Sequence, residues 1–334
     1  MMHDSDKVMD INIGPLFEEE VPMADRIFRL AFGTFLGLAD PMTFFGDADY
    51  VRTRLLADPS GALAAKTNSG ELVGFNFVTN WGSVGFFGPL VVHPKYWDKG
   101  IGKRLLEPTM DIFKERGNKH LGLFTFAQSP KHVALYQKFG FWPRFLTAVM
   151  SKPIDIGEKR YDTITNSRNW YWDKYSEVAE SDQQEVVNQC HSVTNSVYEG
   201  LDLQNEIRAI RNHNLGDTLL LRSRKKQGKV VGLAACHSGP GTEAGSGSCY
   251  IKFGAVFSEP NKEQTFEGLL GACELFAKEK GLSRIVAGVN TGRSELYKKM
   301  LYYGFRSDMQ GISMHKPNEP GYDLADIYTI DDWR

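Results

Sequence analysis

Hydrophobic and polar positions near the start of the chain follow the two periods that distinguish strands from helices. Val8 to Leu16 alternates apolar and polar residues and predicts a strand. Ile27 to Phe35 carries apolar residues at helical spacing, and a second short helix is expected from about Ala48 to Ala57, before Pro59. The pattern therefore predicts a strand followed by two helices.

Three strands are predicted next. The apolar-rich runs Ala62 to Thr67 and Glu71 to Asn80 surround the turn residues 68–70, which is typical of a hairpin. Val84 to Val92 predicts a further strand, which leads directly into a loop around Gly100. The two sides of the hairpin should pair in antiparallel fashion.

Helices and strands then alternate to the end of the first half. The loop is followed by an amphipathic helix that should be kinked at Pro108 and closed by Gly117. The remaining elements expected in this half are a strand from His120 to Phe126, a helix from Ser129 and Pro130 to about Phe139, and a strand from Phe141 to Met150. This order predicts a mixed α/β fold.

The same markers recur in the second half of the chain, which indicates an internal repeat. Gly70 and Gly74 in GELVG match Gly228 and Gly232 in GKVVG, with an offset of 158 residues. The other matched sets are Gly88 and Pro94 with Gly254 and Pro260, at an offset of 166, and Gly117, Gly140 and Phe141 with Gly281, Gly304 and Phe305, at an offset of 164. We therefore expect two copies of one fold, at 1–153 and 154–334.

The changes in offset locate the differences between the copies. Eight residues are gained in the stretch Ser238 to Ser248, which is expected to be a flexible loop by composition, and two are lost at the glycine loop. Counting back from Gly281 places Gln264 opposite Gly100 and Phe266 opposite Gly102. The second copy should therefore lack the first copy's glycine loop.

The remaining segments of the second half are assigned from composition and pattern. Lys152 to Lys174 is interpreted as a connector, and helices are expected at Ser181 to Tyr198 and Gln204 to Asn212. Pro317 to Arg334 should pack as a terminal extension.

Composition narrows the class of protein. A chain of 334 residues fits two domains, and 39 basic against 41 acidic residues leave no broad basic field for nucleic acid or anionic lipid. No apolar run approaches the ~18 residues of a membrane helix, and the charged N-terminus predicts a cytoplasmic protein. The four cysteines are widely spaced and form no Cys/His cluster, so we expect reduced thiols and no metal.

Two glycines at a helix start suggest where chemistry takes place. Gly100 and Gly102 allow several backbone N–H groups at the head of the helix to point at one spot, which favours an anion. A tight connection without a ligand is the alternative. A dinucleotide or P-loop site is disfavoured, because the loop lacks a third glycine and a Lys-Ser/Thr pair.

With these motifs the first half resembles the GNAT superfamily of acyl-CoA-dependent N-acetyltransferases. The family pattern of Gln or Arg, two residues, Gly, one residue, and Gly or Ala stands here as WDKGIG, so Trp97 departs from it. The second motif is ALYQKFGF, with Leu135, Tyr136, Gly140 and Phe141. The resemblance implies two GNAT-like domains, the second degenerate, each with a central, mostly antiparallel sheet flanked by helices.

The resemblance also implies a site that uses acetyl-CoA as co-substrate and no metal. Backbone groups of the loop would hold the CoA phosphates, the strand before it would bind pantetheine and polarise the acyl carbonyl, and Tyr136 would protonate the leaving thiolate. Ser129 stands where the family often has Asn, and it serves as a pantetheine contact or as a helix cap. The residues assigned to the cofactor are Leu90, Val91, Val92, Trp97, Asp98, Lys99, Gly100, Ile101, Gly102, Lys103 and Ser129.

Several roles stay open at this point. Tyr136 is a general acid or a packing aromatic, while its counterpart Met300 cannot donate a proton. Candidates for the general base are Asp40, Asp47, His93 or a chain of waters, and the aromatics Phe44, Phe45, Trp81, Phe86 and Phe87 line an acceptor pocket or belong to the core.

Two classes of function remain. The first is transfer of an acetyl group to a primary amine of a small molecule or a protein, by a monomer or homodimer that engages neither nucleic acid nor membrane. The second is an acyl-CoA sensor or scaffold that binds without catalysis. Release of the CoA thiol in the presence of amines distinguishes them.

Overall fold

The computed structural model describes residues 10–154 and 167–334 of the chain, which form two compact units. Unit 1 comprises residues 10–46, 50–79 and 87–116, and unit 2 comprises 47–49, 80–86, 117–154 and 167–334. The two units differ from the two expected copies, because unit 2 also contains the end of the first copy. The expected boundary between the copies at 153 and 154 stays a prediction.

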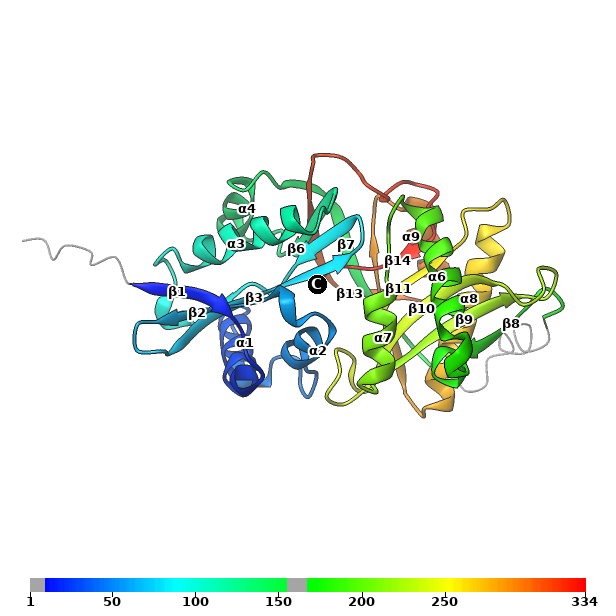
Figure 1. Ribbon diagram of the computed structural model, residues 1–334, viewed down its shortest axis with the longest axis horizontal. Helices are drawn as coiled ribbons and strands as arrows, with labels where there is room; N and C mark the ends of the chain where they lie inside the picture. The colour runs from blue at the N-terminus through cyan, green and yellow to red at the C-terminus, as the bar shows by residue number, and fades with distance from the viewer. Residues whose placement is uncertain (1–9, 155–166) are drawn as a thin grey trace, which may run out of the picture. The chain divides into compact units, whose positions relative to one another are not determined.

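Unit 1 is a small antiparallel sheet covered by helices (Figure 1). Its elements are β1 (Ile11–Pro15), α1 (Val21–Phe35), α2 (Tyr50–Ala57), β2 (Ala62–Thr67), most of β3 (Leu72–Trp81), β5 (Val91–Val92) and α3 (Ile101–Glu115). The predicted hairpin is confirmed, because β2 pairs antiparallel with β1 and β3. The α3 residues Ile101 and Leu105 pack on Ile11, Leu63 and Val73 of the sheet.

Unit 2 contains the rest of the first copy and all of the second (Figure 1). Its elements from the first copy are most of β4 (Val84–Phe87), β6 (His120–Thr125), α4 (Pro130–Gln137) and β7 (Trp142–Pro153). Those of the second copy are β8 (Trp170–Lys174), α6 (Gln183–Val197), α7 (Gln204–Asn212), β9 (Gly216–Ser223), β10 (Val230–Gly239), β11 (Gly245–Val256), α8 (Lys262–Glu279), β12 (Arg284–Asn290), α9 (Ser294–Tyr302), β13 (Arg306–Lys316) and β14 (Thr329–Ile330).

The structure explains why glycines recur in both copies. Gly117 and Gly281 follow corresponding helices with φ of 69° and 67°, and Gly140 and Gly304 have φ of 85° and 92°. These are left-handed conformations that glycine adopts without steric cost. The internal repeat is therefore a repeat of backbone conformation as well as of residue type.

Three sequence-based assignments need correction. The strand expected from Val84 to Val92 is broken into β4 and β5, with residues 88–90 between them. The expected connector ends in a strand, because β8 pairs antiparallel with β9, and its residues 155–166 lie outside the described residues. Most of the expected flexible loop Ser238 to Ser248 extends the β10–β11 hairpin, and residues 240–244 form its turn.

The two copies exchange their last strands. β13, from the second copy, pairs antiparallel with both β6 and β7 of the first, and β7 pairs antiparallel with β12 of the second. Since β6 and β12 correspond at the offset of 164, as do β7 and β13, the exchange is reciprocal. Its backbone hydrogen bonds join segments that are far apart in the sequence.

Two lysines at equivalent positions each contact the other copy with their side chains. Lys316 of β13 donates from Nζ to the carbonyl of Phe139 at 2.9 Å and lies against Gly140 of the first copy. Lys152 of β7 lies against Gly304 of the second copy and pairs with Glu274 at 3.2 Å. Each copy therefore supplies a lysine to the other's glycine turn.

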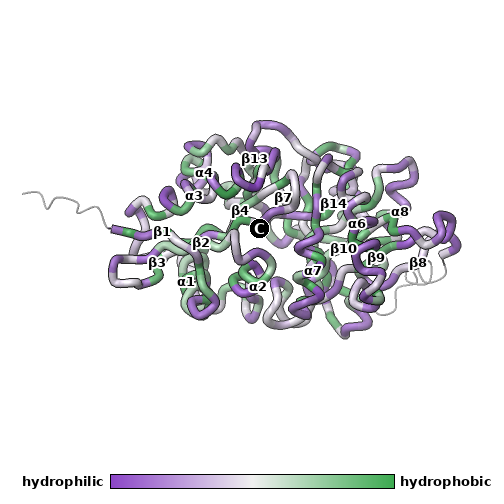
Figure 2. The backbone as a smooth tube through the Cα atoms, in the orientation of Figure 1, coloured by the Kyte–Doolittle hydropathy of each residue, from purple (hydrophilic) through white to green (hydrophobic). Residues whose placement is uncertain are grey.

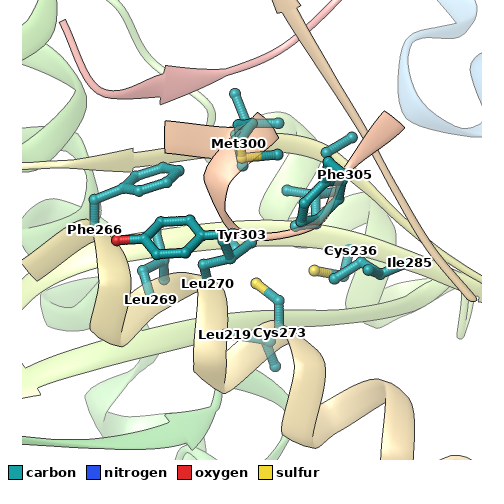
Figure 3. Close-up of a cluster of buried hydrophobic side chains, with 14 of the residues drawn as sticks. Leu219, Cys236, Phe266, Leu269, Leu270, Cys273, Ile285, Met300, Tyr303 and Phe305 are labelled. Carbon is teal, nitrogen blue, oxygen red and sulfur yellow. The ribbon is translucent and has the colours of Figure 1, made fainter. Parts of the chain in front are cut away.

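Buried hydrophobic side chains form the core of the second copy. The backbone tube is hydrophilic at the turn beyond β8 and β9 (Figure 2). One core cluster lies between α8, α9 and the sheet, and it includes Cys236 and Cys273 (Figure 3). All four cysteines are buried and unbridged. This agrees with the thiols expected from the sequence.

A buried charge network fixes the β10–β11 hairpin to α7. Nζ of Lys252 lies 2.9 Å from both Glu206 and Glu243, and all three side chains are buried. Burial raises the pKa of Glu206, but Lys252 and His237 outweigh it and bring that pKa to about 2. A carboxyl with a lowered pKa stabilises the fold above its unfolded pKa, and this contribution is lost as the pH falls toward 2.

We predict that Lys252→Ala lowers the free energy of unfolding by about 3–5 kcal/mol, because two carboxylates would be left buried without their cation. Urea denaturation followed by circular dichroism measures the change. The exposed Lys225 in the neighbouring hairpin is the control, and Lys225→Ala should stay within about 0.5 kcal/mol of wild type. Equal effects of the two substitutions would show that the network is not stabilising.

Candidate functional site

The glycine loop of unit 1 has the geometry expected of an anion site. A short 3-10 turn, Pro94–Tyr96, is followed by residues 97–100, and α3 begins at Ile101. Gly100 is the N-cap with φ of 74°, a left-handed conformation that disfavours other residues. The first N–H groups of α3 have no partner within the helix and carry the positive end of its dipole.

Trp97, which departs from the family pattern, anchors this loop. Its indole Nε1 donates to the carbonyl oxygen of Val92 at 2.7 Å, so the loop is tied to the end of β5. A tryptophan can make this bond because its ring carries a single N–H donor at its edge. The sequence offered no signal for this role, since the bond depends on how the chain turns between the two residues.

Basic side chains surround the loop. Lys99 lies with its Nζ 5.1 Å from the centre of the Tyr96 ring, and Arg104 donates to the carbonyl of Ile11. Lys103 is largely exposed, and its nearest acidic partner is Glu107 at 3.8 Å. Basic residues thus outnumber the one acidic residue of the loop, Asp98, and this balance of charge favours an anion.

The strand before the loop is held close to β3. Val91 and Val92 of β5 pair with Phe75 and Gly74, and a Cβ on Gly74 would lie 2.7 Å from the carbonyl of Val91. Glycine is therefore required at position 74. Leu90 lies in the break between β4 and β5.

A buried arginine that the sequence pattern did not predict lies at this break. Arg54 of α2 donates from Nη1 to the carbonyl of Gly88 at 2.5 Å, and its side chain is buried. The sequence offers no signal for this contact, because the carbonyl that Arg54 reaches lies 34 positions away along the chain. Arg54 fixes the backbone just ahead of the expected pantetheine strand.

Tyr136 lies on α4 and Ser129 directly precedes that helix, so both belong to unit 2, whereas the glycine loop belongs to unit 1. Ser129 is the N-cap residue, but its side chain makes no capping bond. Tyr136 is buried and hydrogen-bonded to Thr125 of β6. Burial raises the pKa of Tyr136 well above its ordinary value, and the bond to Thr125 only partly offsets this, so the phenol is protonated at neutral pH.

Each candidate base has a structural partner. Asp40 accepts from the backbone N–H of Met42 at 3.0 Å, and Nδ1 of His93 accepts from the N–H of Lys95 at 3.1 Å. Burial lowers the pKa of His93, and the neighbouring Lys95 adds to this effect. Asp47 accepts from the backbone of Ser246 at 2.8 Å and from its hydroxyl at 2.5 Å. None of these contacts singles out one base.

The candidate aromatics belong mostly to the cores. Phe86 and Trp81 contact each other with ring centres 4.7 Å apart in unit 2, and Phe87 is buried against Phe113 in unit 1. Phe44 packs on Phe28, whereas Phe45 is 38% exposed with φ of 60°. Of the five aromatics, Phe45 keeps substantial exposure.

The second copy has lost the corresponding chemistry. Phe266 of α8, which stands opposite Gly102, and Met300 of α9, which stands opposite Tyr136, are both completely buried (Figure 3). They lie in the same hydrophobic cluster as Tyr303 and Phe305. Where the first copy has a glycine and a phenol, the second has core side chains.

Comparison with known proteins identifies the first copy. Residues 26–141 match the model of the Acetyltransferase (GNAT) family, so this part of the chain is a GNAT acetyltransferase domain. A mycothiol acetyltransferase of Clavibacter sepedonicus is 30% identical over 96 residues, which are 29% of this chain and 32% of that protein. The match thus spans less than a third of the curated relative.

Solved structures extend the likeness to both copies. A putative acetyltransferase from Pyrococcus horikoshii is similar over 95% of this chain and 92% of its own, with a TM-score of 0.60 and 15% identity. A tandem GNAT protein from the clavulanic acid biosynthesis pathway is similar over 92% and 98%, with a TM-score of 0.55 and 12% identity. The N-acetyltransferase region of a fungal β-N-acetylglucosaminidase matches 92% of this chain and 38% of that one, with a TM-score of 0.64 and 14% identity. The chain therefore has the fold of tandem GNAT proteins.

Among residues 10–154 and 167–334, no group of three or more His, Cys, Asp or Glu residues is placed to hold a metal ion. In the same ranges, no helix has the length and apolar character needed to cross a membrane.

The two loop glycines predict opposite responses to alanine. Gly100→Ala should lower the free energy of unfolding by about 1–2 kcal/mol, because alanine is strained in a left-handed conformation. Gly102→Ala should leave the protein at least as stable as wild type, since Gly102 lies in helical conformation and alanine favours a helix. Thermal unfolding of both variants measures the difference. A reversed order would contradict the loop conformation.

Proposed function

We propose that the chain is an acyl-CoA-dependent N-acetyltransferase whose first copy carries the cofactor and whose second copy does not. The observation that carries this proposal is the glycine loop at the head of α3, with Gly100 in left-handed conformation and basic side chains around it. The family match over residues 26–141 supports the same activity. The second copy lacks both glycines and the tyrosine.

The loop is suited to the pyrophosphate of CoA. Backbone N–H groups at the helix start would bind the phosphates, while Lys99 and Lys103 add positive charge. The backbone of residues 90–92 would accept the pantetheine arm and polarise the acyl carbonyl. Trp97 contributes by fixing the loop to Val92 through its indole, and its backbone belongs to the loop that would hold the phosphates.

The reaction joins an amine to the acyl group. The amine nitrogen attacks the thioester carbonyl, the C–N bond forms, the C–S bond breaks, and the thiol leaves as a thiolate that must gain a proton. Tyr136 would supply a hydrogen bond and a proton to that thiolate, while a water or a nearby base takes the proton that the amine loses. Because the pKa of Tyr136 is raised, the phenol stays protonated, and its hydroxyl can donate a hydrogen bond to the sulfur as negative charge develops there.

The acceptor is proposed as a primary amine. The mycothiol acetyltransferase and the fungal glucosamine N-acetyltransferase region show that similar chains serve different acceptors, so their substrates do not transfer directly. A panel of amines assayed with acetyl-CoA, with thiol release as the readout, identifies the acceptor. Tight CoA binding without release for any amine would favour an acyl-CoA sensor instead.

Gly102→Glu should reduce acetyl-CoA affinity by at least about tenfold, because it places a carboxylate at the phosphate site. Isothermal titration calorimetry of acetyl-CoA measures the loss. Gly102→Ala is the matched control, since the family pattern admits Ala at this position, and its affinity should remain close to wild type. If the glutamate variant binds acetyl-CoA like wild type, the loop is not the pyrophosphate site.

Tyr136→Phe should lower kcat by about 10²-fold or more and leave acetyl-CoA affinity nearly unchanged, because the hydroxyl acts after binding. Steady-state kinetics with an amine that the panel identifies separates kcat from affinity. Tyr302, on α9, is 82% exposed, and Tyr302→Phe is the control expected to behave as wild type. An unchanged kcat in the Tyr136 variant would remove it as the general acid.

A further inference from the structure

The last residues of the chain lie in a cleft between two strands of the second copy. β11 pairs in parallel with β12 from Ser248 to Ile251, and farther along Gly254 and Ala255 pair antiparallel with β14 instead. β14 also contacts β12. The C-terminal segment, red in Figure 1, therefore enters where β11 and β12 separate.

This cleft corresponds to the expected cofactor channel of the first copy. At the offset of 166, Gly254 and Ala255 match Gly88 and Pro89, which directly precede the strand residues assigned to pantetheine. The next residues, 256–258, match Leu90 to Val92. The tail thus lies along the same part of the repeated fold that would receive the cofactor in the first copy.

The residue that anchors the tail also stands at a cofactor position. Arg293 matches Ser129 at the offset of 164, and its guanidinium is 1% exposed. It donates to the carbonyl of Thr329 and bonds Asp331 at 3.0 Å, and its Nε lies 3.0 Å from Asp323. A buried guanidinium requires such partners, because an unpaired charge in the interior is costly.

Tail residues before and after the one that Arg293 binds, Asp331, make further contacts with the second copy. The ring of Tyr328 lies 5.6 Å from that of Phe266, the residue that stands opposite Gly102 of the phosphate loop. Asp332 accepts from the hydroxyl of Tyr250 at 2.9 Å, and its Cβ lies 2.2 Å from the position of a Cβ on Gly288. Glycine at position 288 is therefore needed for the tail to fit.

Residues at the end of the segment are also buried and hydrogen-bonded. Trp333 donates from Nε1 to the hydroxyl of Tyr322 at 3.1 Å, and that hydroxyl donates to Asp331 at 2.9 Å. The Trp333 ring lies against Gly122 of β6, where a Cβ would approach it to 2.2 Å. The side chains of Ile330, Asp331, Asp332 and Trp333 are all buried.

We propose that the second copy has become a binding site for the chain's own C-terminal segment, residues 322–334, which occupies the cleft equivalent to the pantetheine channel. The comparison with pantetheine rests on the proposed function, whereas the docking of the segment does not. The site takes an extended acidic peptide: β11 provides an antiparallel edge and Arg293 provides the cation for its carboxylates.

Hydrogen–deuterium exchange on the full chain tests this docking. Arg293→Ser, which places the first copy's residue at the equivalent position, and Asp331→Asn on the tail should each release the segment. Amides of 327–333 are expected to exchange at least about tenfold faster in both variants, while those of α6 and β9 keep their wild-type rates. Lys262→Ala is the control, because it removes an ion pair with the 69% exposed Asp326 of the same tail and should change nothing.

Two outcomes would overturn the proposal. If exchange rises to the same extent throughout unit 2, the tail is an inseparable part of the core rather than a docked segment. If 327–333 stay protected in both variants, Arg293 and Asp331 do not hold it. Adding acetyl-CoA to the same samples and following residues 97–104 tests the proposed function separately, because those residues lie outside the tail and its site.

Discussion

The exchange of last strands is the interaction on which the arrangement of unit 2 depends. β13 lies between β6 and β7, and β7 in turn pairs with β12, so neither copy completes its sheet with its own strand alone. A strand with both edges paired leaves no unsatisfied backbone groups for another chain to capture. The lysines that reach the partner copy's glycine turn strengthen the same junction.

The two copies share a backbone fold and differ in the side chains at equivalent positions. In the first, glycines at the head of α3 leave backbone N–H groups accessible to an anion, and a buried phenol stands on α4. In the second, Phe266 and Met300 stand at these places and belong to a hydrophobic cluster. The copies also differ because the C-terminal segment, held by Arg293, occupies the cleft of the second copy. One repeated fold thus carries the candidate site in its first copy, and a hydrophobic core together with the packed tail in its second.

The sequence predicted much of this correctly. Alternating and helical periods predicted the elements from β1 to β7, except that the strand expected from Val84 to Val92 is broken into β4 and β5. The spacing of Gly70, Gly74, Gly117 and Gly140 revealed the repeat, because left-handed turns and close strand approaches admit little but glycine. The same counting identified Phe266 and Met300 as replacements in the second copy. The glycine loop was found because a left-handed residue ahead of a helix leaves a local signature.

Tertiary structure alone decided the contacts between distant segments. The strand exchange was not predictable, since β7 and β13 have the same pattern whichever copy they join. The sequence does not explain why Trp97 departs from the family pattern, and the structure does, because the indole donates to the carbonyl of Val92. The sequence likewise does not indicate which carbonyls and carboxylates Arg54 and Arg293 bind. Periodicity and glycine spacing record local backbone conformation, which a sequence determines by itself. The partner of a buried arginine or an edge strand is set only when the whole chain is packed, because residues far apart in sequence supply it.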